Sequence, residues 1–305
     1  MELHFLGTGA GVPSKQRNTS AIALKFLNHY KGSLWLFDCG EATQHQILHT
    51  TLKLSKLDHI FITHLHGDHL FGLPGILGSR SFQGGTSPLT IYGPVGIKHF
   101  VKTVLSTSKT VLRYPLSIIE IHDDMSLDLG EHHVYIKKLD HAIESFGFRI
   151  EEKSKHGTLL VEQLKKLGIQ PGPIYKAIKN GEQVKLDDGR IISGKDFLGP
   201  EKKGKVITVL GDTRRCDTAI SLAKKANVLI HEATFMKKDS HLAFDYFHST
   251  SEDAAYIAKR AKVSKLILTH ISSRYQKDNI NMLVREARKI FPKTYIAEDL
   301  RMFTI

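Results

Sequence analysis

Short apolar and β-branched runs recur along the whole chain and alternate with stretches whose apolar residues have helical spacing. Many of the early runs follow one another as the strands of hairpins do. Strands and helices mixed in this way predict an α/β (α+β) fold, in which helices cover sheets. The predicted strands are 2–7, 20–26, 33–40, 59–64, 89–94, 133–141, 145–152, 206–213, 228–235, 265–272 and 293–300. The predicted helices are 40–48, 96–106, 217–226, 251–261 and 280–291.

The helix predicted over 251–261 has a clear start signal. In the letters STSEDAAYIAKRA, Ser249 is placed to cap the helix, and Glu252 follows three residues later. Asp253 adds negative charge to the first turn, where it stabilises the helix dipole. We therefore expect Ser249 and Glu252 to form a capping box at this point.

Residues 153–205 interrupt the pattern of strands and are rich in Lys, Gly and Pro. Between residues 150 and 205 there are 12 Lys and Arg against 8 Asp and Glu, a local surplus of four positive charges. An ordinary excursion between two strands is one explanation, but loops of this length are uncommon without a function of their own. We expect one domain over residues 1–305 with an inserted arm over 153–205.

Composition and charge narrow the class of protein. Lys and Arg number 43 against 31 Asp and Glu, and a net charge of +12 favours an anionic partner such as nucleic acid. The two cysteines, Cys39 and Cys216, form no CxxC motif, which argues against a disulfide scaffold and a thiolate zinc site. Neither a signal-peptide pattern nor an apolar run of the ~20 residues that span a membrane is visible. We expect a cytoplasmic protein with no membrane contact.

The letters FITHLHGDH, which end at His69, crowd metal-binding side chains into a short space. Side chains alternate in an extended chain, so His64 and His66 point the same way. Gly67 allows a sharp turn, after which Asp68 and His69 aim elsewhere. The stretch can therefore serve two neighbouring ions. Imidazole and carboxylate without thiolate suit zinc, with manganese as the alternative. A histidine-rich surface loop is the competing explanation, but chance seldom produces HxHxDH spacing.

Four of the apolar runs end in a residue that can bind metal. They end in His64, His141, Asp212 and His270. Ligands at the ends of several strands converge on one rim of a sheet, so these residues are candidates for completing the site. The Asp212 carboxylate has two oxygens and can bridge two ions.

The letters THLHGDH resemble the signature of the metallo-β-lactamase superfamily. His141, Asp212 and His270 fit the later ligand positions of that superfamily in order and type. The resemblance implies an αββα four-layer sandwich with a dinuclear site along one edge between the two sheets. It also implies hydrolysis, but the superfamily cleaves lactams, thioesters, lactones and phosphodiesters, so the substrate is left open.

Five further motifs stand in the sequence: PSKQRN (13–18), GPIYKAIKNGE (172–182), HEAT (231–234), HST (248–250) and AEDL (297–300). They resemble motifs of the ribonuclease Z family, and the similarity runs through nearly the whole chain, with a length typical of the short form of that family. The resemblance implies a zinc-dependent endoribonuclease that removes the 3′ trailer from precursor tRNA by phosphodiester hydrolysis. It also implies a 3′-hydroxyl on the tRNA, a 5′-phosphate on the trailer, and a homodimer.

The resemblance also assigns the ligands of two zinc ions per subunit. One ion takes His64, His66 and His141. The other takes Asp68, His69 and His270. Asp212 lies between the two ions.

The same resemblance assigns the proton transfers. Asp68 accepts a proton from the attacking water as well as binding metal. His248 protonates the departing 3′ oxygen, because an alkoxide leaves poorly. Glu232 is a candidate for orienting His248.

Substrate contacts are expected at two places. Lys15, Arg17 and Asn18 of the PSKQRN motif, and Arg274 just after His270, are placed to contact substrate near the site, where cationic side chains suit phosphate groups. Gly172 and Pro173 belong to the arm, which we expect to contact the tRNA backbone away from the cut.

Two other motifs are set aside. LGTGAG (6–11) has GxGxG spacing without a following helix pattern, so we expect a tight turn beside the site and no nucleotide cofactor. Cys39 is expected to be a small buried residue and not a nucleophile. Two competing functions stay open: a small-molecule phosphodiesterase or other hydrolase on the same scaffold, and a metal-dependent RNA-binding module without turnover.

Overall fold

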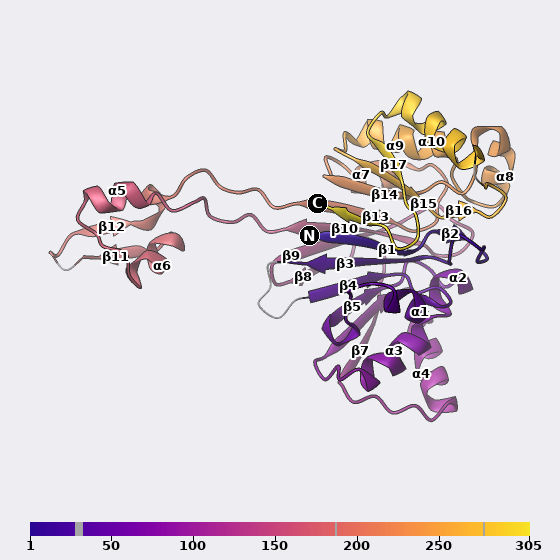
Figure 1. Ribbon diagram of the computed structural model, residues 1–305, viewed down its shortest axis with the longest axis horizontal. Helices are drawn as coiled ribbons and strands as arrows, with labels where there is room; N and C mark the ends of the chain where they lie inside the picture. Colours follow the sequence, from indigo (N-terminus) through magenta and orange to yellow (C-terminus); the bar gives the residue numbers. More distant parts are fainter. Residues whose placement is uncertain (28–32, 187, 277) are drawn as a thin grey trace. The chain divides into compact units, whose positions relative to one another are not determined.

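The computed structural model describes residues 1–27, 33–186, 188–276 and 278–305, which form two compact units. Unit 1 comprises residues 1–129, 133–150 and 206–305, and unit 2 comprises residues 130–132 and 151–205. The segment that the sequence sets apart, 153–205, lies within unit 2. The helices and strands are labelled in Figure 1.

The first sheet of unit 1 has the strand order β18-β1-β3-β4-β5-β6-β7. Antiparallel pairs join β18, β1, β3 and β4, whereas β4, β5, β6 and β7 run parallel. The bounds are β1 Glu2–Gly7, β3 Ala21–Phe26, β4 Ser33–Phe37, β5 Leu57–Phe61, β6 Leu89–Gly93, β7 Leu116–Glu120 and β18 Met302–Thr304.

The second sheet has the order β17-β15-β14-β13-β10-β9-β8. Its strands β13, β14, β15 and β17 run parallel. The bounds are β8 Ser126–Leu129, β9 His132–Lys138, β10 Phe146–Glu152, β13 Val206–Leu210, β14 Val228–Glu232, β15 Leu266–Thr269 and β17 Thr294–Ile296.

Helices cover the outer face of each sheet, so unit 1 has four layers (Figure 1). The first sheet carries α1 Thr43–Leu48, α3 Leu73–Phe82 and α4 Ile97–Thr107, and the short α2 Gly67–Leu70 precedes α3. The second sheet carries α7 Asp217–Leu222, α9 Ser251–Ala261 and α10 Asp278–Ile290, and α8 is Ser240–Asp245.

Alternating side chains build these layers. In β3, Ile22, Leu24 and Phe26 join the core between the two sheets, whereas Ala21 and Ala23 join the core beneath the helices of the first sheet. Side chains point to opposite faces along a strand, and both faces of the strand are covered here. Each sheet is therefore apolar on both sides, as the nearly continuous apolar runs of the sequence require.

The start of α9 corrects a detail of the sequence analysis. Thr250 caps the helix, its side chain accepts from the backbone of Asp253, and the Asp253 side chain accepts from the Thr250 backbone. The prediction of Ser249 with Glu252 was wrong by one position, because the Ser249 hydroxyl donates to the Thr213 carbonyl oxygen instead, at 2.6 Å. The helix itself spans the predicted residues.

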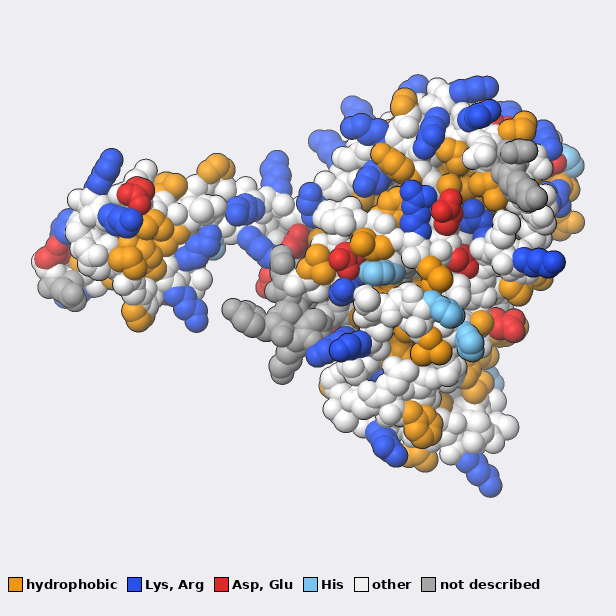
Figure 2. All heavy atoms as spheres, viewed as in Figure 1, with side chains coloured by type: hydrophobic (Ala, Val, Ile, Leu, Met, Phe, Trp, Pro, Cys, Tyr) orange, Lys and Arg blue, Asp and Glu red, His pale blue; other side chains and the backbone are white. Residues whose placement is uncertain are grey.

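Unit 2 has its own secondary structure and a small core. It contains α5 Val161–Lys166, α6 Ile174–Lys179, β11 Gln183–Lys185 and β12 Ile191–Ser193, and the two strands pair antiparallel. The core consists of Leu164, Ile169, Ile178 and Leu186. Figure 2 shows Lys and Arg side chains spread over the visible face of this unit.

A two-stranded sheet closes the fold beside the ends of the main strands. It pairs β2 (Gly9–Ala10), which follows β1, with β16 (Ile271–Ser272), which follows β15. The loop after the first strand is thereby held next to the loop that contains His270. Within the described residues, no helix combines the length and the apolar character needed to cross a bilayer.

Candidate metal centre and active site

The seven predicted ligands lie together in unit 1, on loops that follow strands of both sheets. The loop after β5 carries His64 and His66, the short helix α2 that follows it carries Asp68 and His69, and single ligands follow β9, β13 and β15. Side-chain nitrogen and oxygen atoms of these residues form groups that could hold a metal ion, with all ligand atoms of a group within 4.8 Å of one another. The groups that consist of predicted ligands are His64 with His66 and His141, His64 with His69 and Asp212, and Asp68 with His69 and His270.

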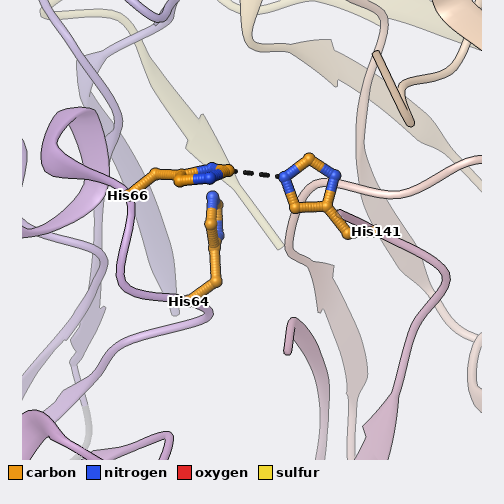
Figure 3. A group of neighbouring side chains, drawn as sticks. All are labelled: His64, His66 and His141. Atoms are coloured by element: carbon orange, nitrogen blue, oxygen red, sulfur yellow. Dashed lines mark hydrogen bonds between the residues drawn. The ribbon is translucent and has the colours of Figure 1, made fainter. Parts of the chain in front are cut away.

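The first group matches the predicted ligands of one ion (Figure 3). His141 Nε2 lies 3.3 Å from His66 Nδ1, and the ring of His64 lies beside both. The extended backbone between His64 and His66 brings the two rings to the same side, as the sequence predicts.

The second group surrounds the carboxylate of Asp212. His69 Nε2 and His270 Nε2 are 3.3 Å apart, and they lie 3.4 Å and 3.3 Å from Asp212 Oδ2. Asp68 Oδ2 is 3.2 Å from His270 Nε2 and 3.5 Å from His69 Nε2. Asp212 Oδ2 also lies 3.7 Å from His64 Nε2, so this one oxygen faces histidines of both groups.

Two of the inward-facing imidazoles are fixed by acceptors on the opposite ring nitrogen. His141 Nδ1 lies 2.8 Å from the carbonyl oxygen of Phe247, and His69 Nδ1 lies 2.7 Å from Asp38 Oδ2. A carbonyl or carboxylate oxygen can only accept, so both Nδ1 atoms carry the proton. In the neutral ring, which is the form that binds metal, the Nε2 atom of each then presents a lone pair to the site.

Two threonines fix two further rings in the same way. Thr63 Oγ1 donates to Asp38 Oδ2 and so accepts from His64 Nδ1, at 2.9 Å. Thr234 Oγ1 donates to Glu232 and so accepts from His270 Nδ1, also at 2.9 Å. In their neutral form these rings too turn an unprotonated Nε2 inward.

The donor set therefore fits cations. Lone pairs of four imidazoles converge with the carboxylates of Asp68 and Asp212, and electron-rich atoms at such distances repel unless a positive charge lies between them. His64 Nε2 is buried and has no hydrogen-bond partner among the described residues, as expected of a nitrogen reserved for metal. Nitrogen and oxygen ligands without sulfur suit zinc.

Backbone contacts place Asp68. Gly67 begins α2 without a left-handed φ, and a Cβ atom there would lie 2.2 Å from the Phe71 ring, which is 65% exposed and would have to turn aside. The Gly11 N–H donates to Asp68 Oδ2 at 2.8 Å. The LGTGAG stretch therefore lies beside the site, as predicted, but it is mostly strand, because it contains the end of β1 and all of β2, and the predicted tight turn was wrong.

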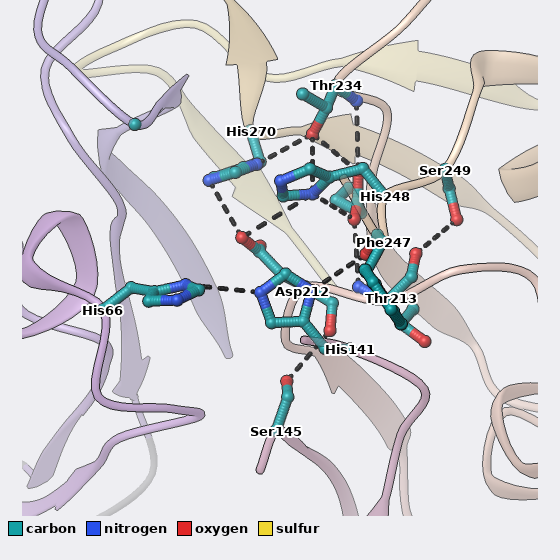
Figure 4. Close-up of polar contacts among 12 residues, drawn as sticks. His66, His141, Ser145, Asp212, Thr213, Thr234, Phe247, His248, Ser249 and His270 are labelled. Atoms are coloured by element: carbon teal, nitrogen blue, oxygen red, sulfur yellow. Dashed lines mark hydrogen bonds and ion pairs between the residues drawn. The ribbon is translucent and has the colours of Figure 1, made fainter. Parts of the chain in front are cut away.

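His248 lies next to the ligands and is held by Glu232. Figure 4 shows His248 beside Asp212 and His270. The His248 Nδ1 atom lies 2.9 Å from Glu232 Oε1, so the pair predicted from the two motifs is in contact. Glu232 is buried and also accepts from the backbone N–H groups of Thr213 and Thr234. Burial would lower the pKa of His248, but the neighbouring Glu232 carboxylate raises it to about 9.

Ligands and His248 line one pocket of about 430 Å³. Asp68, Asp212 and His270 form its polar side, and Phe235 and Tyr246 contribute aromatic surface. The pocket is of the size that holds a nucleotide-sized ligand. The arrangement can bind cations, hold an anionic group beside them and deliver a proton from His248.

The predicted substrate contacts differ in exposure. Lys15 and Arg274 are exposed, and the Arg274 guanidinium lies 5.2 Å from the centre of the Phe235 ring at the pocket. Arg17 is only 7% exposed and donates to Thr8 Oγ1 and to the Ala297 carbonyl oxygen, which gives it a structural contact.

Asn18 likewise has structural contacts. Its side chain donates to the Glu41 carbonyl oxygen and its backbone donates to Asp299. Gly172 and Pro173 are exposed in unit 2, directly before α6. Substrate contacts by Arg17, Asn18, Gly172 and Pro173 stay predictions.

Sequence reasoning missed the four groups that orient ligands, which are the side chains of Asp38, Thr63 and Thr234 and the Phe247 carbonyl. Asp38 accepts from His69 and Thr63, and Thr234 accepts from His270. Asp38 directly follows the apolar run of β4, which is the same strand-end signal that points to the ligands. Cys39 is buried, as predicted, and burial raises the pKa of its thiol.

Comparison with known proteins finds relatives that match over the full length of the chain. The chain is 58% identical over 306 residues to a ribonuclease Z of Bacillus cereus, with 100% of this chain and 99% of the relative covered. It is also 58% identical over 305 residues to the ribonuclease Z of Geobacillus kaustophilus, with the same coverage. The chain belongs to the ribonuclease Z family.

Solved structures agree with this assignment. Human tRNase Z, short form (ELAC1), matches with a TM-score of 0.72 and 31% identity over 100% of this chain and 99% of the human chain. The metallo-β-lactamase fold protein YhfI from Bacillus subtilis matches with a TM-score of 0.68 and 21% identity, covering 99% of this chain and 98% of that one, which supports the fold. The predicted αββα sandwich and the family resemblance are confirmed.

A family model matches the first part of the chain. Residues 1–158, just over half of the chain, match the model described as Anti-Pycsar protein Apyc1, which places the chain in that family too. This match ends before Asp212, His248 and His270. The full-length ribonuclease Z matches are therefore the ones that cover the whole site.

Proposed function

We propose that the chain is a zinc-dependent endoribonuclease that removes the 3′ trailer from precursor tRNA. Membership of the ribonuclease Z family supports a hydrolytic, tRNA-processing endoribonuclease. The observation that carries the proposal is the position of the His248–Glu232 pair beside a complete set of inward-facing ligands. A site that only bound metal would have no need of a buried carboxylate that holds a histidine toward the pocket.

We propose two zinc ions per subunit, with manganese as the alternative metal. His64, His66 and His141 would hold one ion, Asp68, His69 and His270 the other, and Asp212 both. Bound zinc would supply a Lewis acid at the phosphate and lower the pKa of bound water to ~7. Asp38, Thr63, Thr234 and the Phe247 carbonyl would keep the imidazoles in the binding tautomer.

The chain's own residues would then manage the protons of the hydrolysis. A water oxygen attacks phosphorus and its proton passes to Asp68, which the Gly11 N–H holds in place. The bond from phosphorus to the 3′ oxygen of the tRNA breaks, and His248 donates a proton to that oxygen. The tRNA leaves with a 3′-hydroxyl and the trailer with a 5′-phosphate.

Substrate binding would rest mainly on charge. Lys15 and Arg274 are exposed on unit 1, and the surplus of Lys in unit 2 suits contacts with the tRNA backbone. We propose that unit 2 is the tRNA-binding arm, with Gly172 and Pro173 among its contacts. Binding of precursor tRNA should therefore weaken steeply as salt concentration rises.

We also propose a homodimer in which the arm of one subunit holds tRNA that the other subunit cuts. The resemblance to the ribonuclease Z family supports this arrangement. The two cysteines are free, which suits the reducing cytoplasm. The mass in solution, measured by light scattering, tests the oligomeric state.

A small-molecule phosphodiesterase is the second candidate, because a pocket of about 430 Å³ can take a small phosphodiester. The surplus of positive charge in residues 150–205 favours tRNA, since a small substrate needs no separate binding unit.

One assay separates the two functions. Purified protein is incubated with 3′-extended precursor tRNA and with a cyclic nucleotide, each with and without chelator, and the RNA ends are mapped. We expect a chelator-sensitive cut directly 3′ of the discriminator nucleotide, with a 5′-phosphate on the trailer. Rapid hydrolysis of the cyclic nucleotide alongside intact RNA would reject the proposal.

A further inference from the structure

We propose that Arg214 is a positioning residue that fixes the direction in which His248 delivers its proton. The inference rests on the proposed role of His248 in cleavage. Arg214 follows Asp212 by two residues, and its side chain is 23% exposed. It contacts the residues directly before His141 and His248, so its position can constrain the positions of both histidines.

Arg214 first joins the loop after β13 to the loop after β9. Its guanidinium contacts both carboxylate oxygens of Asp140, with Nε 3.2 Å from Oδ2 and Nη2 3.4 Å from Oδ1. The Arg214 backbone N–H donates to the Asp140 carbonyl oxygen at 2.8 Å. A two-pronged contact of this kind fixes the plane of the guanidinium as well as its position.

The oriented guanidinium then packs on the segment before His248. It lies 3.9 Å from the centre of the Phe247 ring and 4.8 Å from that of Phe244. Arginine stacks on aromatic faces through attraction between the cation and the π electrons. Phe247 therefore has its ring held from one side by Arg214.

The backbone of Phe247 explains why this contact matters. Its φ angle is 58°, a left-handed conformation that a bulky residue adopts only when its surroundings impose it. The Phe247 carbonyl oxygen accepts from His141 Nδ1 at 2.8 Å, and the next residue is His248 (Figure 4). Without the stacked guanidinium the strained residue can relax, and relaxation there turns His248.

Arg215 supplies a matched control. It is the next residue, also a cation, and it stacks on an aromatic ring, with its guanidinium 4.8 Å from the centre of the Tyr256 ring. Its ion pair is with Asp253, at 3.2 Å, on α9. Arg215 thus shares the charge and the neighbourhood of Arg214 but lacks the contacts with Asp140 and Phe247.

The test compares two substrates that differ in their need for a proton. Precursor tRNA releases a basic 3′ alkoxide, whereas bis(4-nitrophenyl) phosphate releases a weakly basic phenolate that needs no acid. For Arg214→Ala we expect kcat on precursor tRNA to fall about 10- to 100-fold, the scale of a misplaced catalytic group. KM, zinc content and kcat on the nitrophenyl ester should stay within about twofold of wild type. Arg214→Lys keeps the positive charge but loses the two-pronged contact with Asp140 and the stacking of a guanidinium on Phe247. Its kcat on precursor tRNA should therefore lie between those of wild type and Arg214→Ala.

Further measurements keep the inference open to refutation. Arg215→Ala should match wild type on both substrates. In a His248→Ala background, Arg214→Ala should cost no further activity, because the two residues act through one step. Equal losses on both substrates, loss of zinc from Arg214→Ala, or the same kcat for the Arg214 and Arg215 variants would overturn the proposal.

A spectroscopic readout separates this inference from the proposed function. The His248 Nδ1–H, bonded to Glu232, should give a slowly exchanging proton NMR signal in wild type and Arg215→Ala, and a faster exchanging one in Arg214→Ala. An unchanged signal in Arg214→Ala would refute the positioning role. Failure of wild type to cut precursor tRNA would refute the proposed function, while the NMR comparison would still decide the role of Arg214.

Discussion

Asp38 offers the sharpest test of how the metal centre is organised. Its carboxylate is 7% exposed and receives three hydrogen bonds. The donors are the Thr63 N–H at 2.7 Å, the Thr63 hydroxyl at 2.9 Å and His69 Nδ1 at 2.7 Å. Asp38→Asn keeps the shape of the side chain and suits the φ angle of 56°, since Asn tolerates the left-handed region.

The substitution replaces an acceptor by a donor. Asn has one acceptor oxygen, so its NH₂ group must face either the Thr63 N–H or both the Thr63 hydroxyl and the His69 N–H. When the amide faces His69, the ring has to move its proton to Nε2, and the lone pair aimed at the metal site is lost. Loss of such an orienting partner weakens metal binding about 10- to 100-fold, or about 1.4–2.8 kcal/mol.

The measurement is zinc affinity, by competition with a chromophoric chelator and by elemental analysis. We expect the ion held by Asp68, His69 and His270 to be lost first, so that at limiting zinc the variant retains one equivalent per subunit. Asp58→Asn is the matched control, because among the described residues Asp58 accepts from the Ser33 hydroxyl at 2.6 Å and has no hydrogen bond to a ligand. If Asp38→Asn binds both equivalents within twofold of wild-type affinity, the tautomer argument is wrong.

Three further outcomes are expected. His248→Ala should keep both metals by elemental analysis while turnover falls about 10²- to 10⁴-fold, and loss of metal would refute its role as the acid. Deletion of residues 155–200 should weaken precursor-tRNA binding and flatten its dependence on salt in filter-binding assays, whereas intact affinity would remove the arm hypothesis. Thr250→Ala removes the cap of α9 and should lower the free energy of unfolding by about 1 kcal/mol in urea titrations. Ser249→Ala leaves this cap in place and should not change the helicity of α9.

Much of the fold and most of the site follow from local patterns. The runs that become β4, β13 and β15 are apolar along nearly their whole length, because both faces of each strand are covered. The ligands stand at strand ends or in the HxHxDH spacing, where neighbours in sequence are neighbours in space. Signals of this kind need no knowledge of distant contacts.

The parts of the fold and of the site that were not predicted depend on contacts between distant segments of the chain. The sequence analysis overlooked α3, because the glycines and proline of LPGILGSRSF weaken its helical signal, although the helix packs on the first sheet. Asp38 and Thr234 act through hydrogen bonds to ligands 31 and 36 residues away. The sequence predicts an exposed cation at Arg17. The side chain is buried instead, because it donates to the Ala297 carbonyl oxygen, which lies 280 residues along the chain.

The origin of the ligands has a mechanical consequence. His64, His66, Asp68 and His69 follow the first sheet, whereas His141, Asp212 and His270 follow the second. Cations bound there would cross-link the two sheets at the edge where their ligand-bearing loops meet. Separation of the two sheets would then break coordination bonds. The free energy of unfolding should therefore rise with the concentration of free zinc, by about 2.7 kcal/mol when that concentration is 100 times the dissociation constant.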